Sequence, residues 1–338
     1  MGGPSNTGRL VQSTLAPGKP GNLHALVLEH EPLLLAQYSR DPVDFHWRRA
    51  LVVTGHGTAS GCLIQSNYQE TLSNPGDFEA VVVEGRNLVH YSRNNSVPGS
   101  PWRRTAVISS KCLGPASLIQ ARFIGNPIRN PGHFQVVVLE DNEPKGKELV
   151  LYTRDNAKPD RPWQKGAVIT TKATGPGSLI QNTLIGMPGA TGNYELVVLE
   201  GTNLVHYWRD NHTTGTPWHR GEIISLHATG NGPGSITQST FGATSGNGNL
   251  NVVVLEGQNL VHYWCDRSRT WQKGAVITTH ATGPGSIIQI EGTTENSVDN
   301  FEVIVVEDST ILAHYSRDNS SPTNAWVRRE NISEFAIG

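Results

Sequence analysis

Residues Gly192 to Ile224, GNYELVVLEGTNLVHYWRDNHTTGTPWHRGEII, form one unit of an internal repeat. The unit begins with an apolar, β-branched run that ends in an acid, Leu196 to Glu200, and continues through a Gly-Thr-Asn turn. A second run contains the sequence His-Tyr-Trp-Arg-Asp, His206 to Asp210, and a Pro-Trp pair opens a third. A fourth short run, Gly234 to Gln238, follows a Gly-rich loop. Short apolar runs separated by turn residues are typical of β-strands, so we predict four strands per unit.

Four positions of this unit recur along the whole chain. The acid recurs as Glu29, Glu84, Glu140, Glu200, Glu256 and Glu307. The tyrosine recurs as Tyr38, Tyr91, Tyr152, Tyr207, Tyr263 and Tyr315, and the tryptophan as Trp47, Trp102, Trp163, Trp218, Trp271 and Trp326. The glutamine of the short run recurs as Gln12, Gln65, Gln120, Gln181, Gln238 and Gln289. A period of about 50 to 60 residues with four short strands is the signature of a propeller blade. We therefore predict an all-β, six-bladed β-propeller with four antiparallel strands per blade.

The repeats also predict the boundaries of the blades. They lie at about residues 8–58, 59–114, 115–175, 176–232, 233–283 and 284–338, within one domain that covers residues 1–338. Each blade takes its strands from one contiguous segment, and the short glutamine run suits the crowded centre of the ring. We therefore expect blade 6 to close the ring by packing against blade 1, without strand exchange.

Composition limits the classes of partner. The net charge is −2 and 17% of the residues are charged, so no basic surface for nucleic acid is visible. The three cysteines fall at different places in the repeat and form neither a disulfide framework nor a metal-ligand pattern. No segment approaches the roughly 18 apolar residues of a membrane span, and the first residues lack a signal-peptide core. We expect no cofactor, no metal ion and no membrane insertion, and a location in the cytoplasm or release without a signal peptide; the sequence is compatible with oligomerisation.

A residue present in all six copies is first of all structural, because every blade must solve the same packing problem. Positions that nearly repeat are more informative about function. The arginine after the Tyr run recurs as Arg40, Arg93, Arg154, Arg209 and Arg317 and is replaced by Cys265. The histidine before the tyrosine recurs as His90, His206, His262 and His314 and is replaced by Gln37 and Leu151. Such variation suits a set of similar sites of which some have been lost.

Arginine, glutamate and tryptophan together have the chemistry to bind a sugar. The guanidinium donates a planar pair of hydrogen bonds, the carboxylate accepts from hydroxyls, and the indole stacks on a C–H face. The predicted binding residues are Arg93, Arg154, Arg209, Arg317, Glu84, Glu200, Glu256, Glu307, His90, His206, His262, His314, Trp102, Trp163, Trp218, Trp271 and Trp326. Counted by blade, the fullest sets are in blades 2, 4 and 6, and we expect weaker sites in blades 3 and 5. The alternatives are that the arginines are solvated surface residues with stems over apolar neighbours, and that the glutamates cap turns.

The repeated pattern NLVHYWRDN, residues 203–211, followed by Pro-Trp resembles the propeller lectins of bacteria and fungi, such as the fucose-binding and tachylectin-like groups. The resemblance covers the whole chain at the level of architecture. It implies several shallow sugar pockets between adjacent blades, lined by Trp, Arg and acidic or amide groups. Its expected partners are glycans or glycoconjugates, bound by many weak sites without catalysis.

Two other functions remain open from the sequence. A sialidase-like glycoside hydrolase is six-bladed as well, and Ser39-Arg40-Asp41, Ser316-Arg317-Asp318 and Thr270-Trp271 match pieces of its Ser-x-Asp-x-Gly-x-Thr-Trp turn, although no copy is complete. A protein-binding scaffold is the other alternative, and the enlarged turn Asp141 to Lys147 is its natural contact. Repetition argues against catalysis, because an enzyme's centre on the ring axis needs different residues from different blades.

Overall fold

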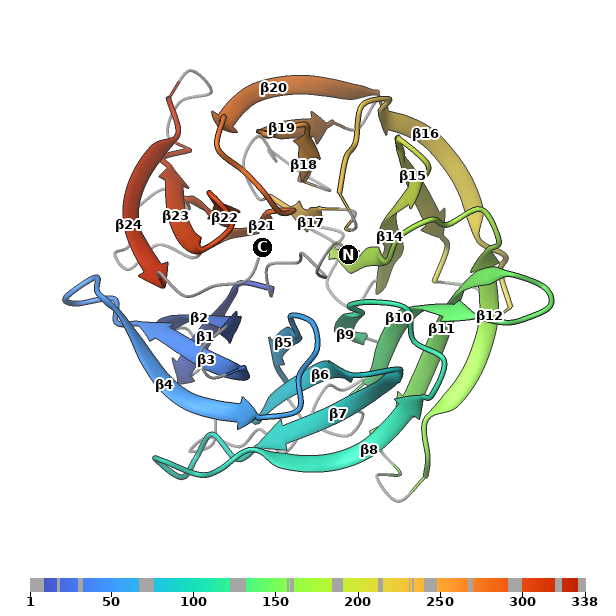
Figure 1. The fold of residues 1–338 in the computed structure, drawn as a ribbon, viewed down its shortest axis with the longest axis horizontal. Coiled ribbons are helices and arrows are strands. Elements are labelled where there is room, and N and C mark those ends of the chain that lie inside the picture. The colour runs from blue at the N-terminus through green and yellow to red at the C-terminus, as the bar shows by residue number, and fades with distance from the viewer. Residues whose placement is uncertain are drawn as a thin grey trace.

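A computed structural model describes residues 9–16, 19–29, 33–66, 76–121, 132–156, 158, 161–183, 191–211, 215–230, 232, 234–239, 248–266, 270–290, 300–319 and 324–333. These residues form six four-stranded antiparallel sheets arranged around a central axis (Figure 1). The predicted fold class is confirmed. No segment within these ranges is a helix of the length and apolarity that a membrane crossing requires. The predicted domain ends, residues 1–8 and 334–338, lie outside the described residues, and the boundaries stay a prediction.

Each blade uses consecutive strands, so the prediction of contiguous blades is confirmed. Blade 1 contains β1 (Val11–Ala16), β2 (Lys19–Glu29), β3 (Leu34–Arg40) and β4 (Trp47–Thr54). Blade 2 contains β5 (Cys62–Gln65), β6 (Phe78–Glu84), β7 (Asn87–Arg93) and β8 (Arg103–Ser109). Blade 3 contains β9 (Ser117–Ala121), β10 (His133–Asp141), β11 (Lys147–Asp155) and β12 (Gln164–Thr170). Blade 4 contains β13 (Gly177–Thr183), β14 (Thr191–Glu200), β15 (Asn203–Arg209) and β16 (His219–Ser225). Blade 5 contains β17 (Ser235–Gln238), β18 (Leu250–Glu256), β19 (Asn259–Cys265) and β20 (Trp271–Thr278). Blade 6 contains β21 (Ser286–Gln289), β22 (Phe301–Glu307), β23 (Ile311–Arg317) and β24 (Val327–Ser333).

The glutamine strands are innermost, as predicted. Figure 1 shows β5, β9, β17 and β21 around the axis and the fourth strand of every blade at the rim. Small side chains at the start of these inner strands join neighbouring blades. Ser117 Oγ accepts from the amide of Leu179 at 3.0 Å, and Ser286 Oγ accepts from the amide of Leu10 at 2.9 Å. The second bond joins blade 6 to blade 1, so the ring closes by packing and inner-strand hydrogen bonds without strand exchange.

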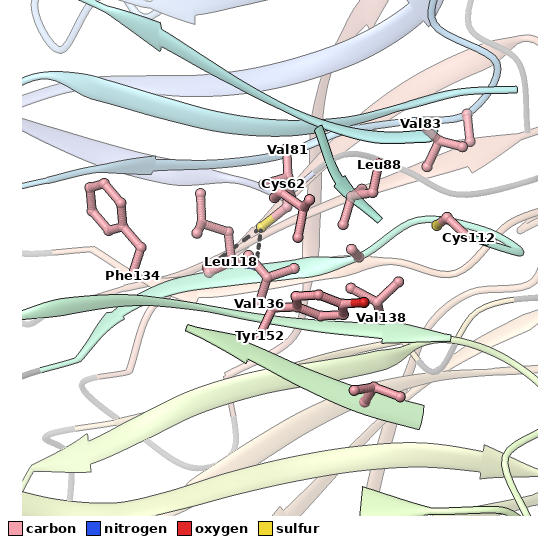
Figure 2. Packing of buried hydrophobic residues seen from close by; sticks show 14 of the residues in the cluster. Cys62, Val81, Val83, Leu88, Cys112, Leu118, Phe134, Val136, Val138 and Tyr152 are labelled. Carbon is pink, nitrogen blue, oxygen red and sulfur yellow. Dashed lines mark hydrogen bonds between the residues drawn. The ribbon is translucent and has the colours of Figure 1, made fainter. Parts of the chain in front are cut away.

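The hydrophobic cores lie between blades rather than within them. One cluster combines Val81 and Leu88 of blade 2 with Leu118, Phe134 and Val136 of blade 3. Figure 2 shows these side chains together with Cys62, whose sulfur contacts the backbone of Leu118. An equivalent cluster occupies each of the other five junctions, including the one that closes the ring. The blades therefore depend on one another for burial, as expected of a repeat unit that cannot bury both of its faces alone.

At one end of the strands, which we call the carboxylate face, the six recurring glutamates sit in equivalent clusters. The tyrosine of the same blade donates to each glutamate in the pairs Tyr38–Glu29, Tyr91–Glu84, Tyr152–Glu140, Tyr207–Glu200, Tyr263–Glu256 and Tyr315–Glu307. A cation from the fourth strand binds each one, namely Arg49, Arg104, Lys165, Arg220, Lys273 and Arg328. Hydroxyls of the preceding blade add a third bond, as in Ser109 to Glu140 and Thr278 to Glu307. These clusters bond each blade to its neighbour.

In blades 2 and 4 a residue other than the glutamate caps the turn between the second and third strands. A threonine from the preceding blade does this, because Thr58 Oγ1 accepts from the amide of Gly85 at 3.0 Å and Thr174 Oγ1 accepts from Gly201 at 2.9 Å. In these two blades the threonine therefore takes the role that the turn-capping alternative gives to the glutamate. The enlarged turn of blade 3 also lies on the carboxylate face, where Asn142 and Gly146 pair across it.

Candidate functional site

The recurring arginines lie at the opposite end of the strands, which we call the arginine face. The alternation of strand residues sends the histidine of one blade and the arginine of the next toward the same junction. At junction 2/3, between blades 2 and 3, the rings of His90 and Trp163 make an edge contact with centroids 5.6 Å apart. Arg154 Nη1 lies 3.1 Å from His90 Nδ1. Each site is therefore built from two blades.

The same three positions meet at every junction. Taken as the histidine position of one blade with the arginine and tryptophan positions of the next, the sets are Gln37, Arg93 and Trp102; His90, Arg154 and Trp163; Leu151, Arg209 and Trp218; His206, Cys265 and Trp271; His262, Arg317 and Trp326; and His314, Arg40 and Trp47. The complete sets are at junctions 2/3, 5/6 and 6/1. Counting by blade, which gave blades 2, 4 and 6, is wrong because the histidine serves the following blade.

Counting by junction also changes which sites lack the histidine or the arginine. Junction 3/4 lacks the histidine, since Leu151 stands at that position, and junction 4/5 lacks the arginine, since Cys265 replaces it. Cys265 is buried and forms no disulfide within the described residues, as is also the case for Cys62 and Cys112. The sequence analysis predicted weaker sites in blades 3 and 5, and the structure places the missing histidine at junction 3/4 and the missing arginine at junction 4/5.

An aromatic residue that the sequence analysis did not identify lies under four of the five arginines. The Cζ atoms of Arg93, Arg154, Arg209 and Arg317 lie 5.7, 5.4, 4.7 and 5.5 Å from the ring centroids of Phe78, Phe134, Tyr194 and Phe301. Each ring stands at or near the start of the second strand and is buried. Burial also lowers the pKa of Arg93, Arg209 and Arg317. The signal in the sequence is an aromatic residue six positions before the recurring glutamate.

Two of the histidines present a ring nitrogen as a hydrogen-bond acceptor. At junction 2/3, His90 Nε2 donates to Glu79 Oε2 at 2.8 Å, which leaves Nδ1 to accept from Arg154. At junction 5/6, His262 Nε2 donates to Asn251 Oδ1 at 3.0 Å. Burial, helped by the charge of Arg317, lowers the pKa of His262 to about 3. Its Nδ1 is therefore an acceptor that faces the junction.

Junction 1/2 satisfies its own polar groups. Gln37 Oε1 accepts from Arg93 Nη1 at 3.1 Å and from the indole nitrogen of Trp102 at 3.2 Å, and Gln37 Nε2 donates to His24 Nδ1 at 3.1 Å. The glutamine amide thus accepts and donates at one place, which is the hydrogen-bonding pattern of a hydroxyl group.

At the other five junctions the indole donor is unpaired within the part of the chain that the structure describes. The buried indole nitrogens of Trp47, Trp163, Trp218, Trp271 and Trp326 have no hydrogen-bond partner among the described residues. Neither do His262 Nδ1 and His314 Nδ1, within the same ranges. A buried polar group without a partner costs on the order of 1–3 kcal/mol, so its repetition at five junctions calls for an explanation.

The predicted glutamates do not share these sites. Glu84, Glu200, Glu256 and Glu307 lie on the carboxylate face, with a tyrosine and a cation on each carboxylate. Their role in binding sugar stays a prediction. A different carboxylate, Glu330 of β24, reaches junction 6/1, where Oε1 lies 4.0 Å from Arg40 Nε.

Other features of the described residues do not converge on the junctions. A pocket with an empty volume of about 490 Å³ lies on the ring axis, lined by Arg9, Ser60 and the serines of the inner strands. Arg9 Nη1 donates there to the carbonyl oxygens of Leu118 and Leu179 at 3.1 and 3.4 Å, a contact that joins blades 1, 3 and 4. No group of three His, Cys, Asp or Glu side chains in the described ranges is placed to hold a metal ion. The sialidase-like fragments are separated too, since Arg40 and Arg317 belong to different junctions.

The chain shares its architecture with solved propellers. It matches a variant of AofleA from Arthrobotrys oligospora, in which three arginines are replaced by alanine, with a TM-score of 0.71 and 12% identity over 97% of this chain and 87% of that chain. It matches an Aleuria aurantia lectin variant in complex with α-methyl-L-fucoside with a TM-score of 0.65 and 12% identity over 99% and 97% of the two chains. A further structure of that fungal lectin, described as a six-bladed propeller with a novel mode of fucose recognition, gives 0.64 and 13% over the same shares. No protein-family model matches the chain, and no curated protein is similar to it in sequence. At these identities the likeness shows the fold.

Proposed function

We propose that the chain is a multivalent carbohydrate-binding protein whose sugar sites are the blade junctions of the arginine face. The observation that carries the proposal is the contrast between junction 1/2 and the others. Gln37 bridges the guanidinium of Arg93, the indole of Trp102 and the acceptor of His24. A sugar hydroxyl has the same ability to accept and donate, and it would supply at the other junctions what the amide supplies at this one.

The aromatic residues fit the rest of a sugar. A pyranose has an apolar C–H face as well as hydroxyls, and the Trp indole offers both an apolar ring and one N–H donor. At junctions 3/4 and 5/6, the guanidinium of Arg209 or Arg317 lies over the Trp ring, at 5.2 and 5.6 Å. Because the indole nitrogens are covered, we expect these arginines to shift when sugar binds.

Four junctions combine an arginine with an indole nitrogen that has no partner in the described ranges: 2/3, 3/4, 5/6 and 6/1. We expect these four to bind. Junction 1/2 is occupied by Gln37, and junction 4/5 lacks the arginine. Several weak sites on one rigid ring give avidity for surfaces that display many glycans. We assign no catalysis, because similar groups recur around the ring instead of converging on one centre. The fungal lectin with the same fold was solved with a fucoside, so fucose-containing glycans are the first ligands to test.

The test is a glycan-array screen followed by calorimetric titration with α-methyl-L-fucoside or the best ligand on the array. We expect about four sites per chain, since four junctions meet the condition above. Arg317→Ala should remove one site. Arg328→Ala is the matched control, because it removes an arginine of the same blade on the carboxylate face. Absence of binding to any glycan, or an equal effect of the two substitutions, would overturn the proposal.

Junction 1/2 offers a gain-of-function variant. Gln37→His restores the residue that four other repeats carry and removes the amide that bonds to Arg93 and Trp102. We expect the stoichiometry to rise by one site per chain. An unchanged stoichiometry in a folded Gln37→His protein would show that the amide does not stand in for a ligand.

A further inference from the structure

Junction 6/1 differs from the other arginine-containing junctions in the aromatic partner of its arginine. Blade 1 has Leu23 where four blades have an aromatic residue under the guanidinium. The Cζ atom of Arg40 lies instead 5.1 Å from the ring centroid of Phe45, in the loop between β3 and β4. Phe45 is 55% exposed, whereas the aromatic residues at the other junctions are buried. An aromatic surface that is internal elsewhere is therefore presented to solvent here.

The loop fixes the backbone from which this ring projects. The amide of Phe45 donates to the carbonyl of Asp41 at 3.0 Å, and the amide of Val43 donates to Asp41 Oδ1 at 2.7 Å. Arg40 Nε donates to the carbonyl of Phe45 at 3.1 Å. Phe45 has a φ of 61°, a left-handed conformation that a bulky side chain adopts only when its surroundings impose it.

Blade 2 shows that the loop does not need an aromatic residue. Its arginine, Arg93, donates through Nε to the carbonyl of Ser100 at 3.0 Å. Ser100 and Phe45 both stand two positions before the recurring tryptophan, so the backbone contact is the same and only the side chain differs. The remaining repeats have Arg161, Thr216, Arg269 and Asn324 at this position. Phe45 is therefore a feature of one junction.

The polar groups of a first sugar site lie next to this ring. Glu330 Oε1 is 4.0 Å from Arg40 Nε, and Glu330 Oε2 is 3.5 Å from His46 Nδ1. Trp47, two positions after Phe45, has an indole nitrogen without a partner among the described residues. Guanidinium, carboxylate and indole thus meet at one junction, and the exposed phenyl ring adjoins the guanidinium.

We propose that junction 6/1 binds a fucose-containing glycan of at least two sugar units, the first among Arg40, Trp47 and Glu330 and the second with its C–H face on Phe45. The inference rests on the proposed function and names the ligand of one site. A ring fixed before binding loses little conformational freedom when a sugar stacks on it, so its contact adds to affinity. The proposal makes junction 6/1 the one site that distinguishes a disaccharide from a monosaccharide.

The test compares α-methyl-L-fucoside with Fucα1-6GlcNAc by calorimetric titration of three proteins: wild type, Phe45→Ser and Phe45→Tyr. In wild type, about one site per chain should bind the disaccharide about fivefold more tightly than the monosaccharide, the size expected of one aromatic contact. Phe45→Ser, which introduces the residue of blade 2, should abolish this difference, and Phe45→Tyr should keep it. Affinity for the monosaccharide should be equal in all three, and thermal unfolding checks that each is folded.

Three results would overturn the proposal. The first is a preference for the disaccharide that persists in Phe45→Ser. The second is an equal loss of monosaccharide and disaccharide affinity in that variant, which would place Phe45 at the first unit. The third is wild-type protein that binds neither fucoside, which would reject fucose binding itself and this inference with it. If the protein binds the monosaccharide but shows no Phe45-dependent preference for the disaccharide, this inference is rejected and the proposed function is retained.

Discussion

The carboxylate face and the arginine face are built from the same six repeats, yet they differ in how their polar groups are satisfied. On the carboxylate face every glutamate receives a tyrosine hydroxyl and a cation, in all six blades. On the arginine face the members vary from junction to junction, and five indole nitrogens have no partner in the described ranges. The invariant glutamate clusters join the blades, whereas the variable junctions of the arginine face contain indole nitrogens that can still donate a hydrogen bond.

The comparison teaches how to separate structure from function within a repeat. The packing problem is identical at each junction, so its solution can recur without change. A binding site of the kind we propose is not required at each junction, so its residues can differ from one repeat to the next, as Cys265 and Leu151 do. Junction 1/2 shows a third outcome, in which a protein amide takes the hydrogen bonds.

The largest expected effect concerns the carboxylate face. Glu140 is 1% exposed and accepts from Tyr152, Lys165 and Ser109. Glu140→Ala leaves these donors without their acceptor, so we expect the free energy of unfolding to fall by about 3 kcal/mol in urea titrations. The number of sugar sites should not change. Glu222→Ala, which removes an exposed carboxylate from β16, should change stability by less than about 0.5 kcal/mol. A loss as small for Glu140 would show that the clusters do not hold the blades.

The two faces should contribute to the pH dependence of the free energy of unfolding in different pH ranges. Burial and Arg317 lower the pKa of His262 from 6.5 to about 3, so the folded protein binds this proton less readily than the unfolded chain. Stability that is present above pH 6.5 is therefore lost as the pH falls below it, by up to about 1.4 kcal/mol per pH unit for one histidine. His262→Gln should reduce that slope in unfolding titrations between pH 6.5 and 4.5.

The carboxylate face responds at lower pH. Burial alone would raise the pKa of Glu256, but the hydrogen bonds from Lys273, Ser225 and Tyr263 outweigh it and lower the pKa below 4.5. The stabilisation is present above pH 4.5 and is lost as the pH falls below that value. Lys273→Met should reduce the slope only in this lower window. Equal effects of His262→Gln and Lys273→Met in both windows would contradict the separation of the two faces.

The smallest effect isolates a single N–H group. Trp102→Phe and Trp163→Phe remove the same atoms, but the first breaks a bond to Gln37 and the second removes an unpaired donor. We expect Trp102→Phe to destabilise the protein by about 1 kcal/mol more than Trp163→Phe in thermal or urea unfolding. Only Trp163→Phe should lose a sugar site in calorimetric titration. The reverse order of stability would mean that the indole of Trp163 has a partner.

The sequence by itself determined the repeat, the number of blades, their contiguous order and the strand alternation. These are local properties, since a strand of period two sends Tyr207 and Arg209 to one face and His206 to the other whatever the rest of the chain does. It also identified arginine, histidine and tryptophan as the recurring polar and aromatic positions of a candidate site, three residue types that the structure brings together.

Only the tertiary structure decided which copies meet. The face of a strand is local, but the blade that packs against it depends on how the ring closes, and so His90 joins Arg154 rather than Arg93. Burial and hydrogen-bond satisfaction are likewise non-local. Every repeat contains the recurring glutamate, and five of the six contain the arginine. Because the two residues lie at opposite ends of the strands, the glutamates are hydrogen-bonded on the carboxylate face, whereas the arginines lie beside indole nitrogens without a partner in the described ranges. The exposure of Phe45 depends in the same way on a loop conformation and on an arginine whose buried partner is missing, which no period in the sequence reveals.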